Sequence, residues 1–177
     1  MRINLKDNGV KMTSTHTLII GASAAGLASA ACLQKENIEF IILEKYSQVA
    51  TSWRNHYDRL HLHTSKKWSA LPFKNFDASL SKYPSRQDVI NYLDTYAKEL
   101  NIQPVFDAEV LSVKKEEDHW ITKTNAETYQ SRFLIVATGR NHTPKMAEFE
   151  GLRSFKEIFY TAHIIKTGKR LLERMYW

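Results

Sequence analysis

The sequence predicts an α/β domain in which a parallel sheet with flanking helices is joined to a small antiparallel β-meander. Two short apolar runs rich in β-branched residues, residues 16–21 and 38–45, have the composition of buried parallel strands. Between them, residues 24–35 are rich in alanine and leucine and contain no β-branched residue, which favours a helix. A strand, a helix and a second strand in this order form a βαβ unit.

A long connection and a second helix follow this unit. Residues 46–84 contain many aromatic, histidine and serine residues with weak periodicity, and connections of this length are usually functional. Ser85 is predicted to cap a helix, with Asp88 at the reciprocal position of a capping box. Apolar residues recur along one face of this helix as far as Leu100.

The last third of the chain completes the predicted sheet. Residues 104–130 alternate in the manner of a strand followed by an antiparallel meander, and residues 132–139 form a buried strand that ends at glycine. We expect residues 1–14 to be a disordered leader, residues 15–168 to be a single domain and residues 169–177 to be a tail.

Composition narrows the classes of function. The 25 basic and 19 acidic residues give a net charge of +6, but the basic residues are scattered, which argues against a nucleic-acid partner. The single cysteine, Cys32, excludes an internal disulfide, and we expect it to be buried in its helix. No signal peptide or membrane span is evident, so we expect a cytoplasmic protein without membrane contact.

Three histidines in the long connection raise the question of a metal site. His56, His61 and His63 have no cysteine or carboxylate at a spacing that would complete a ligand set. We therefore expect no metal.

The turn "GASAAG" at residues 21–26 resembles the pattern G-x-G-x-x-G that joins a strand to a helix in dinucleotide-binding domains. There the backbone approaches a pyrophosphate, which is bound by the amide groups at the start of the helix. Here the middle glycine is replaced by Ser23, which takes up room but offers a hydroxyl that could itself bind phosphate.

An acidic residue at the end of the second strand strengthens this interpretation. Glu44 follows Gly21 at the distance where an acidic side chain accepts the ribose hydroxyls of a bound dinucleotide. The alternative is that Glu44 is an ordinary solvated charge beside Lys45. With this acid in place, the unit is predicted to be a Rossmann-like FAD/NAD(P)-binding domain for NAD or FAD, without a 2′-phosphate at this site.

Four longer stretches carry a more specific resemblance. They are "GASAAGLASAACLQKENIEFIILEK", "SWRNHYDRLHLHTSKKWSALPF", "YPSRQDVINYLDTYAKELNIQPVFDAEV" and "FLIVATG". Together they resemble the flavin-containing monooxygenases, particularly the YUCCA-like branch and its bacterial relatives. This resemblance implies an FAD-binding domain whose flavin is reduced by NADPH and then uses oxygen to oxygenate a small organic substrate.

The resemblance also implies roles for individual residues, although it assigns no catalytic residue. The glycine turn would meet the FAD pyrophosphate, Glu44 the adenosine ribose, and the backbone of Val110 the adenine. Trp53 and Arg54 would lie near the ribityl chain and flavin ring, although Trp53 could instead be hydrophobic cover for its loop. The expected cofactor-binding residues are Gly21, Ala22, Ser23, Ala24, Ala25, Gly26, Glu44, Lys45, Trp53, Arg54, Leu60, His61, His63, Val110, Ala137 and Gly139.

The sequence departs from this family after the last predicted strand. In the stretch "FKEIFYTAHIIKTG", Phe155 matches the family motif, but Glu157, Thr161 and Ile165 stand where the family has glycine, histidine and tyrosine. The sequence contains no second G-x-G-x-x-G, so we expect a truncated protein that lacks the NADPH-binding domain. A non-catalytic FAD or nucleotide binder, a flavoprotein half that needs a partner, and a homo-oligomer stay open as alternatives.

Overall fold

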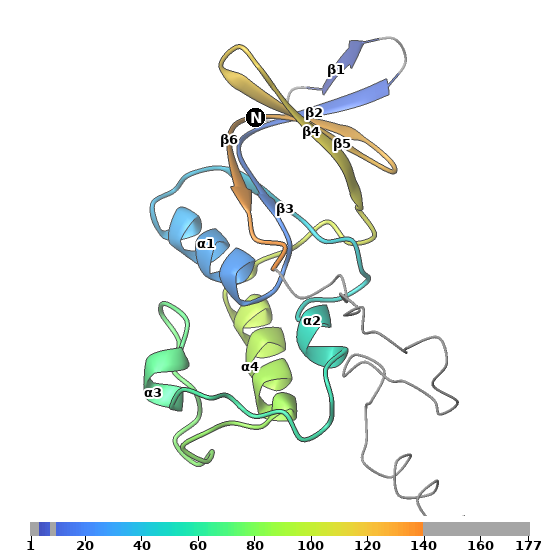
Figure 1. Ribbon diagram of the computed structural model, residues 1–177. Helices are drawn as coiled ribbons and strands as arrows, with labels where there is room; N and C mark the ends of the chain where they lie inside the picture. The colour runs from blue at the N-terminus through green and yellow to red at the C-terminus, as the bar shows by residue number, and fades with distance from the viewer. Residues whose placement is uncertain (1–3, 8–9, 140–177) are drawn as a thin grey trace, which may run out of the picture.

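The computed structural model describes residues 4–7 and 10–139 and has an α/β fold (Figure 1), which confirms the predicted fold class. Residues 1–3 and 8–9 of the expected leader lie outside the described residues. So do the altered motif that begins at Phe155 and the expected tail at residues 169–177.

Six strands form one mixed sheet in the order β1-β2-β6-β5-β4, with β3 paired to β2. β2 runs parallel to β3 and β6, whereas β4, β5 and β6 form the predicted antiparallel meander. The strands are β1 (Asn4–Asp7), β2 (Val10–Ile20), β3 (Phe40–Leu43), β4 (Val110–Glu116), β5 (His119–Thr124) and β6 (Thr128–Val136).

The start of β2 differs from the expectation of a leader that extends to residue 14. The strand begins at Val10, and Thr13 and Thr15 pair with Tyr129 and Ser131 of β6. Both threonines are buried. Threonine is a β-branched residue that fits a strand despite its hydroxyl, so the polar composition concealed an alternation with a period of two residues.

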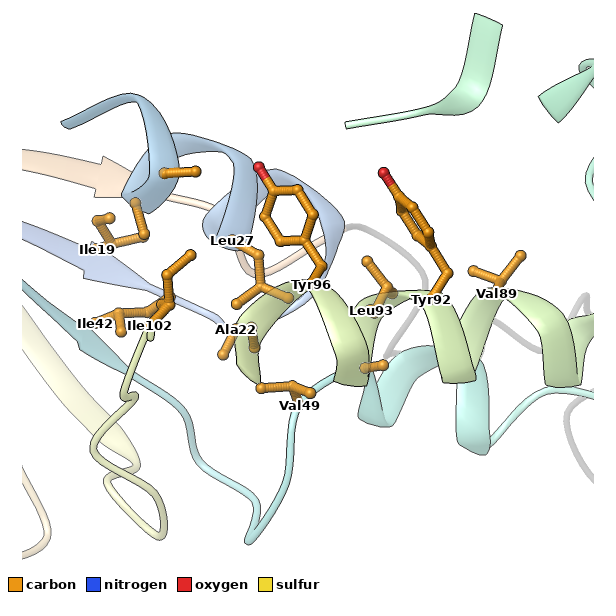
Figure 2. Close-up of a cluster of buried hydrophobic side chains, with 14 of the residues drawn as sticks. Ile19, Ala22, Leu27, Ile42, Val49, Val89, Tyr92, Leu93, Tyr96 and Ile102 are labelled. Atoms are coloured by element: carbon orange, nitrogen blue, oxygen red, sulfur yellow. The ribbon is translucent and has the colours of Figure 1, made fainter. Parts of the chain in front are cut away.

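Two helices that are far apart in the sequence cover one face of the parallel strands. α1 (Ala24–Lys35) packs on β2 and β3, and α4 (Arg86–Glu99) packs against α1. The core between them is apolar (Figure 2), with Leu27, Leu93 and Tyr96 almost fully buried. The thiol of Cys32 is exposed, which contradicts the expectation of burial, because it lies on the face of α1 away from this core.

The predicted capping box of α4 is confirmed. The backbone N–H of Asp88 donates to the Ser85 hydroxyl, and the backbone N–H of Ser85 donates to the Asp88 carboxylate. These two bonds satisfy donors that the first turn of a helix leaves without partners.

The long connection contains two short helices, α2 (Thr51–Arg54) and α3 (Lys66–Ser69). The Lys66 ammonium donates to the backbone carbonyls of Asp77, Ala78 and Leu80, so this side chain ties α3 to the loop that follows it. Contacts to α4 also hold the connection, because the Tyr92 hydroxyl accepts from the N–H of Leu71 and donates to the carbonyl of Lys74.

The buried Tyr96 of α4 should make the domain less stable in alkaline solution. The hydroxyl of Tyr96 donates to the carbonyl of Pro72 at 2.8 Å, and burial, together with the charge of Tyr92, raises the pKa of Tyr96 to about 12. Above the ordinary tyrosine pKa of 10.0 the unfolded chain ionises first, so the free energy of unfolding should fall as the pH rises from 10.0 towards about 12.

Urea unfolding at a series of alkaline pH values would measure this fall. Tyr96→Phe should show a smaller slope with pH than the wild-type chain, because it removes the raised pKa. Equal slopes for the two chains would contradict the assignment to Tyr96.

Candidate functional site

A cleft of about 1140 Å³ opens at the carboxyl ends of the parallel strands β2, β3 and β6. Ligands of open α/β sheets bind at these strand ends. The walls are the turn after β2, the end of β3, the helix α2, the approach to β4 and the end of β6. The lining residues are Ile20, Gly21, Ala22, Ser23, Ala24, Ala25, Leu43, Glu44, Lys45, Tyr46, Thr51, Ser52, Trp53, Asn55, His56, Ala108, Glu109, Val110, Val136, Ala137, Thr138 and Gly139.

Close backbone packing explains both outer glycines of the turn. Gly21 has a φ of +104°, and a Cβ there would lie 2.6 Å from the carbonyl oxygen of Ala137, which directly follows β6. A Cβ on Gly26 would lie 1.8 Å from the carbonyl oxygen of Gly21. Because atoms cannot approach this closely, the turn joins the sheet and α1 only with glycine at these two positions.

Glu44 is a buried carboxylate that is bonded to the turn. Its exposed fraction is 8%, its Oε2 accepts from the backbone N–H of Ala22 at 2.8 Å, and its Oε1 accepts from the N–H of Tyr46 at 3.1 Å. A carboxylate has about four acceptor positions, so this group can accept further bonds in the cleft. The alternative of a solvated surface charge is therefore wrong.

Ser23 stands at the middle position of the turn and begins α1. It makes no side-chain capping bond, and its hydroxyl lies 3.2 Å from the hydroxyl of Ser52 on α2. The first N–H groups of a helix have no partner within the helix, so the start of α1 offers donors at this wall of the cleft.

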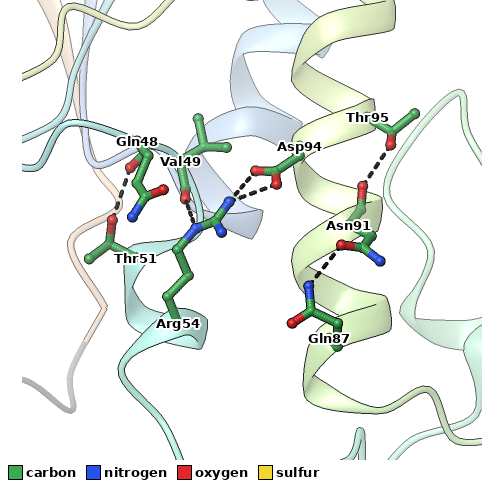
Figure 3. Close-up of polar contacts among 8 residues, drawn as sticks. All are labelled: Gln48, Val49, Thr51, Arg54, Gln87, Asn91, Asp94 and Thr95. Atoms are coloured by element: carbon green, nitrogen blue, oxygen red, sulfur yellow. Dashed lines mark hydrogen bonds and ion pairs between the residues drawn. The ribbon is translucent and has the colours of Figure 1, made fainter.

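Arg54 forms a brace between α2 and α4 (Figure 3). Its guanidinium donates to both carboxylate oxygens of Asp94 at 2.6 and 2.7 Å and to the carbonyl of Val49 at 3.1 Å. Arg86 in turn donates to the carbonyl of Arg54 at 2.9 Å. Arg54 does not line the cleft, but it fixes the helix that presents Ser52 and Trp53 there.

Asp94→Asn should loosen α2 without unfolding the domain. The ion pair is partly exposed, with side-chain exposures of 26% for Arg54 and 43% for Asp94, so we expect a loss of stability below about 1 kcal/mol. Hydrogen exchange should nevertheless become faster at the amide of Asn55, which closes α2 on the carbonyl of Thr51.

Glu99→Gln is the matched control, because Glu99 lies on the same helix and pairs with Lys74 instead. Equal exchange rates at α2 in the two variants would contradict the bracing role of Asp94.

The structure brings most of the expected cofactor residues together. Those that line the cleft are Gly21, Ala22, Ser23, Ala24, Ala25, Glu44, Lys45, Trp53, Val110, Ala137 and Gly139. Gly26 is buried directly behind the turn. Leu60, His61 and His63, like Arg54, lie outside the lining; His63 is exposed, and His61 forms an isolated bridge with Ser85.

Several lining residues were not predicted from the sequence. Thr51 and Ser52 precede Trp53 directly, and Ala108 and Glu109 precede Val110, so proximity to predicted residues was the available signal. Asn55 and His56 follow Arg54 directly, so the same signal was available for them, but His56 was considered only as a metal ligand.

Residues 4–7 and 10–139 contain neither a metal-binding cluster nor a membrane-spanning helix. No three histidine, cysteine or acidic side chains in this part gather as a metal site would require. No helix in the same ranges has the length and apolar character to cross a bilayer.

A glycine turn at the end of a parallel strand, bonded to a buried acid from the next strand, defines a Rossmann-like domain of the FAD/NAD(P)-binding kind. The chain belongs to the pyridine nucleotide-disulphide oxidoreductase family, which it matches over residues 18–170.

Individual relatives agree with this assignment. The chain is 36% identical to a probable indole-3-pyruvate monooxygenase, YUCCA4, of Arabidopsis thaliana, over 89% of this chain and 39% of the relative. It is 38% identical to the uncharacterized oxidoreductase CzcO of Bacillus subtilis, over 73% of this chain and 38% of that protein. A flavin-containing monooxygenase from Stenotrophomonas maltophilia has the same fold, with a TM-score of 0.74 and 25% identity over 80% of this chain and 43% of the other.

These matches confirm the resemblance to flavin-containing monooxygenases that we inferred from the sequence. The chain spans about 39% of the length of the plant relative, so it corresponds to one part of such proteins.

Proposed function

We propose that this chain binds FAD in the cleft and is the FAD-binding portion of a flavin-dependent monooxygenase. The observation that carries the proposal is the hydrogen bond from the N–H of Ala22 to the buried carboxylate of Glu44. It joins the phosphate-binding turn to the acid that accepts ribose hydroxyls, and a dinucleotide needs both groups at one place. The named monooxygenases among the relatives support the same reading.

The chemistry of the cleft suits the adenosine and diphosphate parts of FAD. The N–H groups at the start of α1 suit the diphosphate, Glu44 suits the adenosine ribose, and the backbone at Val110 suits the adenine. Trp53 and Ala137 add apolar surface to the lining. The cleft has a volume of about 1140 Å³, which leaves room for an extended ligand.

When bound, FAD supplies the electron transfer and the reaction with oxygen, while the residues of this chain bind and orient it. For the whole protein we propose NADPH as the reductant and a small organic molecule as the substrate. The part described here accounts for the FAD site, and the relatives are more than twice as long as their match to this chain. The NADPH site then belongs to further sequence or to a partner.

Gel filtration of the purified chain with added FAD tests the proposal. We expect one FAD per chain to elute with folded protein and to show visible flavin absorption. A folded chain that elutes without flavin would contradict the proposed function.

Addition of NADPH to the flavin-loaded chain separates the alternatives. We expect no reduction of the flavin by NADPH and full reduction by dithionite, as for a half that needs further sequence or a partner. Reduction by NADPH would show that the chain itself carries the complete reductive step.

A further inference from the structure

We propose that Ser23 and Ser52 form a two-residue phosphate ligand that replaces the missing middle glycine of the turn. This inference rests on the proposed FAD site and deepens it. Both residues line the cleft, Ser23 at the start of α1 and Ser52 on α2.

The backbone at position 23 does not require glycine. Ser23 has φ −109° and ψ −162°, an extended conformation that any residue adopts, whereas Gly21 has a φ of +104°. A glycine at position 23 would therefore contribute only room for a phosphate to approach the backbone. Serine gives up part of that room, and its hydroxyl is the one group it offers in exchange.

The hydroxyl of Ser23 does not accept a bond from the backbone N–H groups that a serine at the start of a helix usually caps. A serine that begins a helix commonly accepts a bond from the N–H two or three positions later, here Ala25 or Gly26. Ser23 makes no such bond and lies 3.2 Å from the Ser52 hydroxyl instead. Its oxygen therefore leaves those N–H groups to another acceptor.

Counting protons shows what the pair can offer. Each hydroxyl has one proton, and one proton is used between the two oxygens. The other remains as a donor towards a third group in the cleft, and a bond to a charged phosphate is stronger than one to a neutral group.

A diphosphate can use both sets of donors at once. One phosphate can accept from the N–H groups at the start of α1 while the other accepts from the hydroxyl pair. The hydroxyl pair therefore adds a donor for a phosphate to the N–H donors of the helix.

Ser52 is held in place by groups outside the pair. The N–H of Ala50 donates to the carbonyl of Ala22 at 3.2 Å, which fixes the start of α2 against the turn. The brace from Arg54 to Asp94 fixes its other end. The distance between the hydroxyls is thus set by the fold before a ligand arrives, which favours binding.

Three variants, each titrated with FAD and ADP, test the inference. Ser23→Ala keeps a side chain at position 23 but removes the hydroxyl that orients Ser52, so it should weaken the binding of FAD and ADP about tenfold. Ser23→Gly restores the close backbone approach and should bind FAD within about threefold of the wild type. Ser52→Ala should weaken FAD and ADP, and its effect should vanish in the Ser23→Ala background because the two serines act as one ligand.

Ser29→Ala is the matched control. Ser29 lies on the same helix, its hydroxyl donates to the carbonyl of Ala25 rather than facing the cleft, and the variant should bind as the wild type does. Melting temperatures of all variants report whether each one folds, and Ser52→Ala keeps the inference testable if Ser23→Ala does not.

The outcomes separate this inference from the proposed function. If the wild type binds FAD and Ser23→Ala binds it equally well, the inference is overturned and the FAD site stands. If the wild type binds ADP in a serine-dependent manner but not FAD, the FAD proposal falls and the hydroxyl pair stands. A folded wild type that binds neither ligand overturns both.

Discussion

Gly26→Ala should abolish FAD binding and lower the free energy of unfolding by about 3 kcal/mol. The added Cβ would lie 1.8 Å from the carbonyl oxygen and 3.0 Å from the carbonyl carbon of Gly21, both backbone atoms. Gly21 cannot retreat, because its N–H donates to the carbonyl of Leu43 at 2.7 Å and so belongs to the sheet. Helix α1 must therefore move, and the turn that begins it moves too.

Urea unfolding and FAD titration of this variant measure the two effects. Ser29→Ala, three residues further along α1, changes no backbone contact of the turn and should leave both quantities unchanged. Gly21→Ala should resemble Gly26→Ala, since its Cβ would lie 2.6 Å from the carbonyl oxygen of Ala137 on a backbone with a φ of +104°. A Gly26→Ala chain with normal stability would contradict the close contact between α1 and the sheet.

The local signals in the sequence were sufficient for the first half of the site. The glycine turn, the alanine-rich helix α1 and the capping box at Ser85 each depend on neighbouring residues, and each is present in the structure. Glu44 was predicted for the same reason, because strand, turn, helix and acid follow one another at a fixed spacing.

Contacts between residues that are far apart in the sequence explain the predictions that were wrong. Residues 10–14 look polar alone and become a strand only beside β6, more than a hundred positions later. In the same way, the sequence suggests two separate elements where β6 is one continuous strand, which pairs with β5 at one end and with β2 along its length. Pairing of this kind leaves no mark in the local pattern.

The side chain of Arg54 shows the same limit at the level of the site. The resemblance located it in the right block, next to Trp53, but could not tell which way it points. Its direction is decided by Asp94, forty positions away on α4, with which it forms an ion pair. Trp53, one position earlier on the short helix α2, lines the cleft instead.

Glu44→Gln should weaken FAD binding about tenfold to a hundredfold while lowering the free energy of unfolding by about 1 kcal/mol. The carboxylate accepts from two backbone N–H groups, those of Ala22 and Tyr46. Glutamine has one oxygen and one NH₂ group, so it can accept from only one of them. Ala22 is fully buried, and its N–H has more to lose than that of the exposed Tyr46, so the oxygen should turn to Ala22.

This orientation retains the turn but places the NH₂ group where Glu44 offers acceptor positions to a ribose. The loss of affinity should therefore exceed the loss of stability, which a merely structural acid would not produce. Glu39→Gln, an exposed position just before β3, is the matched control and should change neither quantity. Unchanged FAD affinity in Glu44→Gln, with a measurable loss of stability, would mean that Glu44 only supports the turn and that the ribose is bound by other groups.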